Sequence, residues 1–146
     1  MPIKRTNNSN AIKAYINEHI ERIQSAIEYN LCYVGETCVN KARSSGNYTD
    51  RTHNLRSSTG YIVVRNGAVV QMSKFEPISG GAKGGRTGKS FATELAKKYN
   101  TGYVLIVVAG MRYAAFVSAK GYDVLDSAEL LAERLVPDML KRIGLK

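Results

Sequence analysis

The sequence contains no tryptophan, and it has only two cysteines, three prolines and two histidines. A structural zinc site needs four nitrogen or sulfur ligands, and the two cysteines are poorly placed to supply half of them. Cys32 and Cys38 are six residues apart on a predicted helix, which puts them about 120° apart around its axis. They cannot bridge each other within that helix. We therefore expect reduced thiols that serve in packing, with no metal and no cofactor.

Acidic residues are also scarce, and long apolar runs are absent. The 12 Asp and Glu residues stand against 21 Lys and Arg, so the formal net charge is +9. The longest apolar run, Tyr103 to Ala109, has seven residues, whereas a membrane-spanning helix needs about 20. A polar stretch rather than an apolar one follows the basic N-terminus, so no signal peptide is predicted. We expect a soluble protein with no membrane partner.

The remaining composition is that of a globular protein, with 44% hydrophobic and 23% charged residues. A chain of 146 residues buries roughly 70% of its unfolded surface, which is enough for a core. We expect a flexible basic segment over residues 1–9 and a single domain over residues 10–146.

A long helix is predicted first. Apolar residues recur three or four positions apart from Ile12 to Ala42, over about eight turns. Ser9 or Asn10 can cap its start, and residues 44–47 end it. We expect its apolar face to pack on a sheet, through Ile16, Ile20, Ile23, Ile27 and Leu31.

The strands and the other helices follow from turn signals and periodicity. Asn-Gly at 66–67 lies between two β-rich runs, 59–65 and 68–73, and predicts a hairpin. A second hairpin is expected from 103–109 and 113–118, and helices are expected over 90–99 and from 126 to 143. Pro137 should kink or restart the last of these. The predicted fold class is α+β: a long N-terminal helix packed on a small, mainly antiparallel sheet, with a short middle helix and a C-terminal helix.

A Gly-rich, acid-free segment covers residues 78–90 and is expected to be a mobile loop. Gly88-Lys89-Ser90 is similar to the end of a phosphate-binding loop, but the pattern needs glycine five residues before Gly88, where Lys83 stands. No buried strand precedes it, so an NTPase is not predicted. The segment carries three cations, Lys83, Arg86 and Lys89. They fit sequence-independent contact with a phosphate backbone, and the alternative is that the segment is a solvated surface loop.

Residues 49–58, Thr-Asp-Arg-Thr-His-Asn-Leu-Arg-Ser-Ser, lie between the long helix and the first hairpin. This segment resembles the Arg-Thr-Gly-Asn-Leu-Arg-x-Ser pattern of the phage tail-completion, or head-tail joining (connector), family of long-tailed phages. The family's later Tyr-Ala-x-x-Val-Glu-x-Gly pattern is similar to residues 113–117 and Gly121. His53 stands where the family has glycine, Ser118 or a neighbour stands where it has glutamate, and one extra residue precedes Gly121.

The resemblance implies a small α+β subunit without enzymatic activity. It implies a homo-oligomeric ring between the capsid portal and the tail tube, in a virion assembled in the host cytoplasm, with connector, portal and tail-tube proteins as neighbours. We expect the ring interface to include Arg51, Asn54, Leu55 and Arg56. The 78–90 loop would then contact genomic DNA in the ring's lumen or dock on a neighbouring protein.

Two alternatives stay open. One is a small basic nucleic-acid-binding protein that recognises no particular sequence, which the net charge favours. The other is an enzyme that uses His53 with the nearby Arg51 and Asp50.

Overall fold

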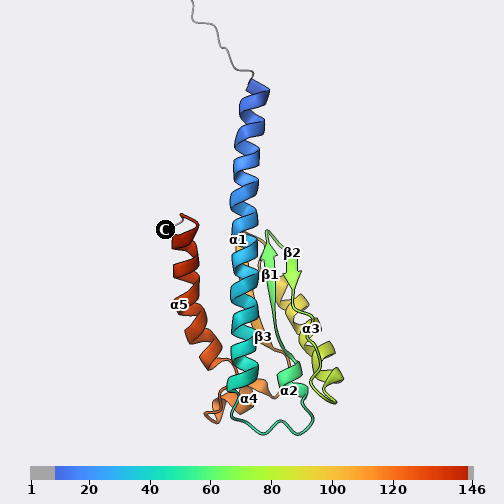
Figure 1. Ribbon diagram of the computed structural model, residues 1–146. Coiled ribbons are helices and arrows are strands. Elements are labelled where there is room, and N and C mark those ends of the chain that lie inside the picture. The colour runs from blue at the N-terminus through green and yellow to red at the C-terminus, as the bar shows by residue number, and fades with distance from the viewer. Residues whose placement is uncertain (1–8, 145–146) are drawn as a thin grey trace, which may run out of the picture.

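The computed structural model describes residues 9–144, which form five helices and a three-stranded sheet (Figure 1). The elements in chain order are α1 (Ser9–Ser45), α2 (Asn54–Ser57), β1 (Thr59–Arg65), β2 (Ala68–Met72), α3 (Ala82–Ala96), β3 (Tyr103–Ala109), α4 (Ala114–Ala119) and α5 (Asp126–Arg142). The α+β prediction is confirmed. Of the segment 1–9 expected to be flexible, only Ser9 lies within the described residues, and α1 begins there.

The sheet has the order β2-β1-β3, with both pairs antiparallel. The predicted hairpin is confirmed, and its turn residues Asn66 and Gly67 have positive φ angles of 49° and 84°, as a tight hairpin turn requires. The central strand β1 is buried on both faces. Tyr61 and Val63 pack toward α1 and α5, and Ile62 and Val64 pack toward α3.

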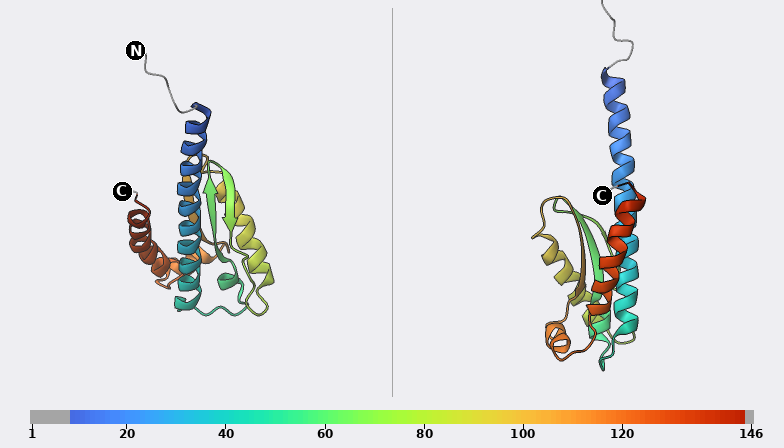
Figure 2. Two further views of the ribbon diagram at one scale, coloured as in Figure 1. Left: turned by 45° about the horizontal axis from the view of Figure 1, so that its top comes forward. Right: turned by 90° about the vertical axis from the view of Figure 1, so that its left-hand side faces the viewer.

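The helices form two layers, one on each face of the sheet (Figure 2). α1 and α5 cover one face and α3 covers the other, while α2 and α4 lie at one end of the molecule. The predicted C-terminal helix is confirmed, and it continues through Pro137 rather than restarting there.

The prediction of a mobile loop over 78–90 is wrong from Ala82 onward, because α3 begins there. Its glycines are buried against the rest of the chain. A methyl group on Gly85 would lie 2.6 Å from the carbonyl oxygen of Phe75, and one on Gly88 would overlap the carbonyl oxygen of Ser58. The glycines therefore permit a close approach of main chains, not mobility.

The prediction of a second hairpin is also wrong. Residues Ala114–Ala119 form α4, and β3 pairs with β1 along its whole length, from Thr59 opposite Ala109 to Arg65 opposite Tyr103. A short apolar run does not distinguish a helix from a strand by its spacing, so the pattern at 113–118 was ambiguous.

The expected packing of α1 on the sheet is correct only for its C-terminal half. Residues from Leu31 to Ala42 supply its buried side chains, and Ile27 is half-buried beside them. Ile16, Ile20 and Ile23 are 49%, 46% and 36% exposed, so their predicted contact with the sheet is wrong within one chain. Seven-residue strands span about 23 Å, whereas the 37 residues of α1 span about 55 Å, so the helix outruns the sheet.

Candidate assembly surface

The N-terminal part of α1 projects beyond the rest of the molecule (Figures 1 and 2). Every residue from Ser9 to Ile23 is exposed, and we call this segment the arm. Four isoleucines spaced four, four and three residues apart share one face of it: Ile12, Ile16, Ile20 and Ile23. A contiguous exposed apolar surface of this kind is typical of an interaction site.

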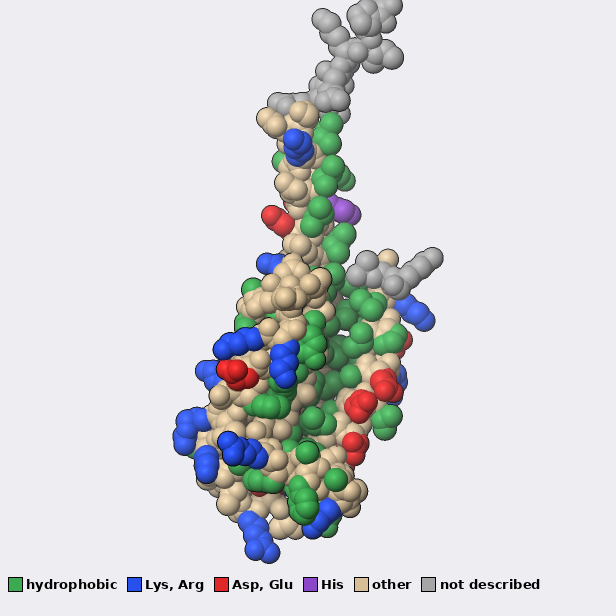
Figure 3. All heavy atoms as spheres, turned by 180° about the vertical axis from the view of Figure 1, so that it is seen from behind, with side chains coloured by type: hydrophobic (Ala, Val, Ile, Leu, Met, Phe, Trp, Pro, Cys, Tyr) green, Lys and Arg blue, Asp and Glu red, His purple; other side chains and the backbone are tan. Residues whose placement is uncertain are grey.

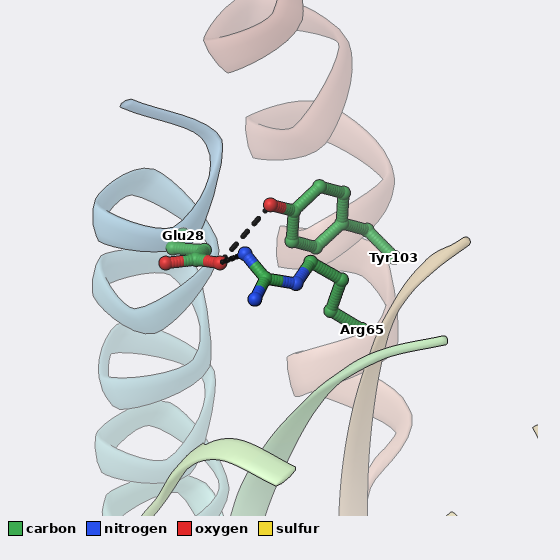
Figure 4. Close-up of polar contacts among 3 residues, drawn as sticks. All are labelled: Glu28, Arg65 and Tyr103. Carbon is green, nitrogen blue, oxygen red and sulfur yellow. Dashed lines mark hydrogen bonds and ion pairs between the residues drawn. The ribbon is translucent and has the colours of Figure 1, made fainter. Parts of the chain in front are cut away.

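A polar cluster fixes the place where the arm leaves the body (Figure 4). Glu28 of α1 accepts hydrogen bonds from the Arg65 guanidinium at 2.8 Å and from the Tyr103 hydroxyl at 3.0 Å, both at the same carboxylate oxygen. Arg65 ends β1, and Tyr103 begins β3 directly opposite it. Burial raises the pKa of Tyr103, so its hydroxyl stays protonated as a donor. The cluster therefore anchors α1 to the sheet below the arm.

An apolar groove of about 560 Å³ opens between β3 and α5. α1 contributes Leu31 to it, β3 contributes Leu105 and Val107, and α5 contributes Ala132 and Val136. Hydrophobic side chains gather in the hollow between these elements, beside acidic residues on α5 (Figure 3). The outer edge of β3 pairs with no other strand among residues 9–144. This groove and the arm are two separate apolar surfaces of one chain.

Most of the residues predicted to form the ring interface already bond or pack within their own chain. The Asp50 carboxylate accepts hydrogen bonds from the main-chain N–H groups of Leu55 at 3.4 Å and Arg56 at 2.9 Å. Leu55 is 2% exposed. The Arg56 guanidinium donates to the carbonyl oxygens of Arg43 at 3.3 Å and Gly46 at 2.6 Å.

Asn54 likewise acts within the chain, because its side-chain oxygen accepts a hydrogen bond from the N–H of Gly84 at 2.9 Å. The expected interface residues Asn54, Leu55 and Arg56 thus join α2 to α1 and α3. Arg51 is exposed and is the member of that set that stays available to a neighbour.

Asp50, Arg51 and His53 do not assemble into a catalytic group. The Asp50 carboxylate is committed to the start of α2, and no hydrogen bond or ion pair links the three side chains within the described part of the chain. His53 has a φ of 61° and a ψ of 11°, the left-handed conformation that glycine adopts most easily.

The three cations of the predicted DNA contact lie on α3 rather than on a loop. Lys83, Arg86 and Lys89 are all exposed, on the side of the helix away from its buried glycines. None of the three forms an ion pair with a residue that the structure describes, whereas Lys97 pairs with Glu94 at 3.1 Å. We call these three residues the basic face; basic side chains gather on this side of the molecule (Figure 3).

The cysteines are free, and burial raises the pKa of both the Cys32 and the Cys38 thiol, which opposes formation of reactive thiolate. Between residues 9 and 144, no three His, Cys, Asp or Glu side chains are grouped as metal ligands would be. No helix in that range has the length and apolarity needed to cross a membrane. Comparisons with protein-family models, curated proteins and solved structures found no significant match.

Proposed function

We propose that the chain is a structural, non-enzymatic virion protein: a ring-forming subunit of the head-tail connector, or tail-completion complex, of a long-tailed phage. The observation that carries the proposal is the arm. A helical segment that exposes four isoleucines on one face, and that contributes no buried side chain to the core of its own chain, is suited to being covered by another subunit.

The placement of the apolar surfaces supports a ring in particular. The arm and the groove are different in shape and lie in different parts of the chain. A contact between two different faces of identical subunits is heterologous, and repeated heterologous contacts close into a ring when the rotation allows.

The conformation at residue 53 supports the resemblance on which the phage assignment rests. The family pattern has glycine at this position, and His53 adopts a positive φ here. The neighbouring motif residues Asn54, Leu55 and Arg56 each pack or bond within the chain, which is what a fold-defining motif requires.

The proposal is tested by deleting the gene from the phage genome that carries it. We expect filled heads and separate tails to accumulate, because the junction between them lacks a component, and we expect the wild-type gene in trans to restore joined particles. Electron microscopy of the lysate measures both. Normal yields of joined, infectious particles from the deletion would contradict the proposal.

A sequence-independent nucleic-acid-binding protein is the second candidate. The exposed cations of the basic face, which form no ion pair with a described residue, favour it. The two candidates differ in the oligomeric state that each predicts, because the connector is a closed ring whereas the second candidate is a monomer or dimer. Closed rings in electron micrographs of the purified chain favour the connector. A chain that stays monomeric or dimeric and binds free duplex DNA tightly favours the second candidate.

A further inference from the structure

We propose that the arm of one copy of this chain lies in the groove between β3 and α5 of a second copy. The inference deepens the proposed function and rests on it for the larger assembly, but the contact itself is argued from the two surfaces of the chain.

The arm is about as long as the two elements that wall the groove. The arm, Ser9 to Ile23, is about 22 Å long as a helix. The groove is walled by β3, a seven-residue strand of about 23 Å, and by α5, a 17-residue helix of about 25 Å. A helix lying lengthwise in the groove therefore covers it from end to end.

The two surfaces also match in chemistry. The arm offers branched aliphatic side chains, and the α5 wall of the groove offers small ones at Ala128 and Ala132 beside the larger Val136. Small residues on one helix let a second helix approach closely, at the 8–10 Å separation usual for packed helices. The rest of the groove is mostly aliphatic, but Tyr103 of β3 adds an aromatic ring and Glu129 of α5 adds a carboxylate.

The arm cannot fill the groove of its own chain. α1 is one uninterrupted helix, and its residue Leu31 already lines the groove. The arm continues the same helix away from the body, and the cluster of Glu28, Arg65 and Tyr103 holds it there (Figures 1 and 4). A fold-back would break the helix, so an arm that lies in the groove has to come from another copy.

The area is sufficient for a specific contact. Half of the surface of a helix as long as the arm is roughly 500 Å², and an equal area of the groove is covered with it, so one contact buries roughly 1,000 Å². That reaches the lower limit for a specific protein interface. In a ring each subunit makes this contact twice, once through its arm and once through its groove.

The contact is tested by cross-linking two single-cysteine variants of the full chain, each in a background with Cys32→Ser and Cys38→Ala. One variant carries Ile20→Cys in the arm and the other carries Ala132→Cys in the groove. We expect a short thiol-reactive bis-maleimide to link them efficiently when they are mixed, and to link neither variant to itself. Circular dichroism and thermal melting establish that each variant is folded.

Three results would overturn the proposal. Ile20→Cys linking to itself would show that arms pair with arms, and Ala132→Cys linking to itself would show that grooves face each other. Folded variants that give no mixed product at any concentration would show that the arm does not enter the groove.

A second pair of variants measures the energy of the contact. Ile16→Asn with Ile20→Asn should weaken self-association about ten-fold or more, because it removes two apolar side chains from the interface. The matched control, Ala14→Asn with Glu21→Asn, places the same residue on the opposite face of the arm, at two exposed positions, and should change self-association little. Equal losses from both pairs would refute the docking of the isoleucine face.

Failure of this inference is distinguishable from failure of the proposed function. A ring that lacks the mixed cross-link refutes the docking and leaves the ring. A closed dimer that gives the mixed cross-link supports the docking and refutes the ring.

Discussion

Glycine shows why the identity of a residue does not by itself fix its role. The run of glycines before Ser90 indicates a mobile loop when it is judged by composition alone, since glycine is the most conformationally permissive residue. In the structure these glycines lie on the inner side of α3, where the main chains of Asn54, Ser58 and Phe75 approach too closely for any side chain. The decisive information is the position of another segment, which the local sequence does not contain.

A substitution at Gly85 tests this role. Gly85→Ala would raise helix propensity by about 1 kcal/mol. The added methyl would lie 2.6 Å from the Phe75 carbonyl oxygen, so the main chain has to shift, at a cost of about 3 kcal/mol. We expect a net destabilisation of roughly 2 kcal/mol in urea unfolding. Ser90→Ala, an exposed position on the same helix, should be slightly stabilising, and the idea fails if Gly85→Ala is too.

Tyr61 gives the fold an alkaline limit. Burial, together with Cys32 and Glu36, raises the pKa of Tyr61 to about 12, against about 10 in an unfolded chain. The folded state therefore holds this proton more tightly, and the resulting stability is complete below about pH 10 and is lost as pH rises toward about 12.

We expect the free energy of unfolding of the wild-type chain to fall over that pH range. In the Tyr61→Phe variant it should fall less steeply with pH, because the phenylalanine ring cannot ionise. Denaturant unfolding of both proteins at neutral and alkaline pH measures the difference. If the free energy of unfolding falls equally steeply with pH in both proteins, other ionisable groups cause the loss of stability at alkaline pH.

At the scale of elements, periodicity and turn chemistry were enough to predict α1, the first hairpin and α5. The 3–4 spacing of apolar residues and the Asn66-Gly67 turn are local signals, and the structure has all three elements where they were expected. The spacing does not show which part of a long apolar face is covered, because the isoleucines of the arm follow the same pattern as the buried Val34 and Cys38. The covered part is set by the length of the strands, because α1 is longer than the sheet on which it packs.

Hydrogen exchange should therefore differ along α1. In the monomer we expect rapid exchange of arm amides, because an isolated helix of this length is marginal in water. Amides near Val34 and Cys38, which are packed against α5 and β3, should be strongly protected. On assembly the arm should become protected as well. Uniform protection of α1 in a dilute, monomeric sample would contradict this account.

At the scale of the whole molecule, charge is distributed unevenly. The net charge of +9 includes the basic face of α3, whereas the acidic residues Asp126, Glu129 and Glu133 lie along α5. The sequence was sufficient to identify Lys83, Arg86 and Lys89 as an acid-free set. It placed them on a mobile loop, and the structure instead holds them on a packed helix. A rigid basic face presents its charges in a fixed spacing and does not reach into a lumen as a loop would.

If the basic face contacts phosphates, its removal should change how DNA binding depends on salt. We expect the triple variant Lys83→Ser, Arg86→Ser and Lys89→Ser to bind duplex DNA more weakly. The slope of log K against log salt should fall in magnitude by about 2 to 3, because each phosphate contact contributes about 0.9. Fluorescence anisotropy of a labelled duplex across a salt series measures both quantities.

The matched control removes the same charge elsewhere. Arg134→Ser, Lys141→Ser and Arg142→Ser on α5 also lower the net charge from +9 by three, to +6, at exposed positions. Long-range attraction depends on net charge and falls equally in both variants, whereas direct contacts are lost only from the variant that carried them. If the slope of log K against log salt falls more in the α3 variant than in the α5 variant, the basic face contacts DNA. Equal slopes in the two variants would show that this face has no role in binding DNA.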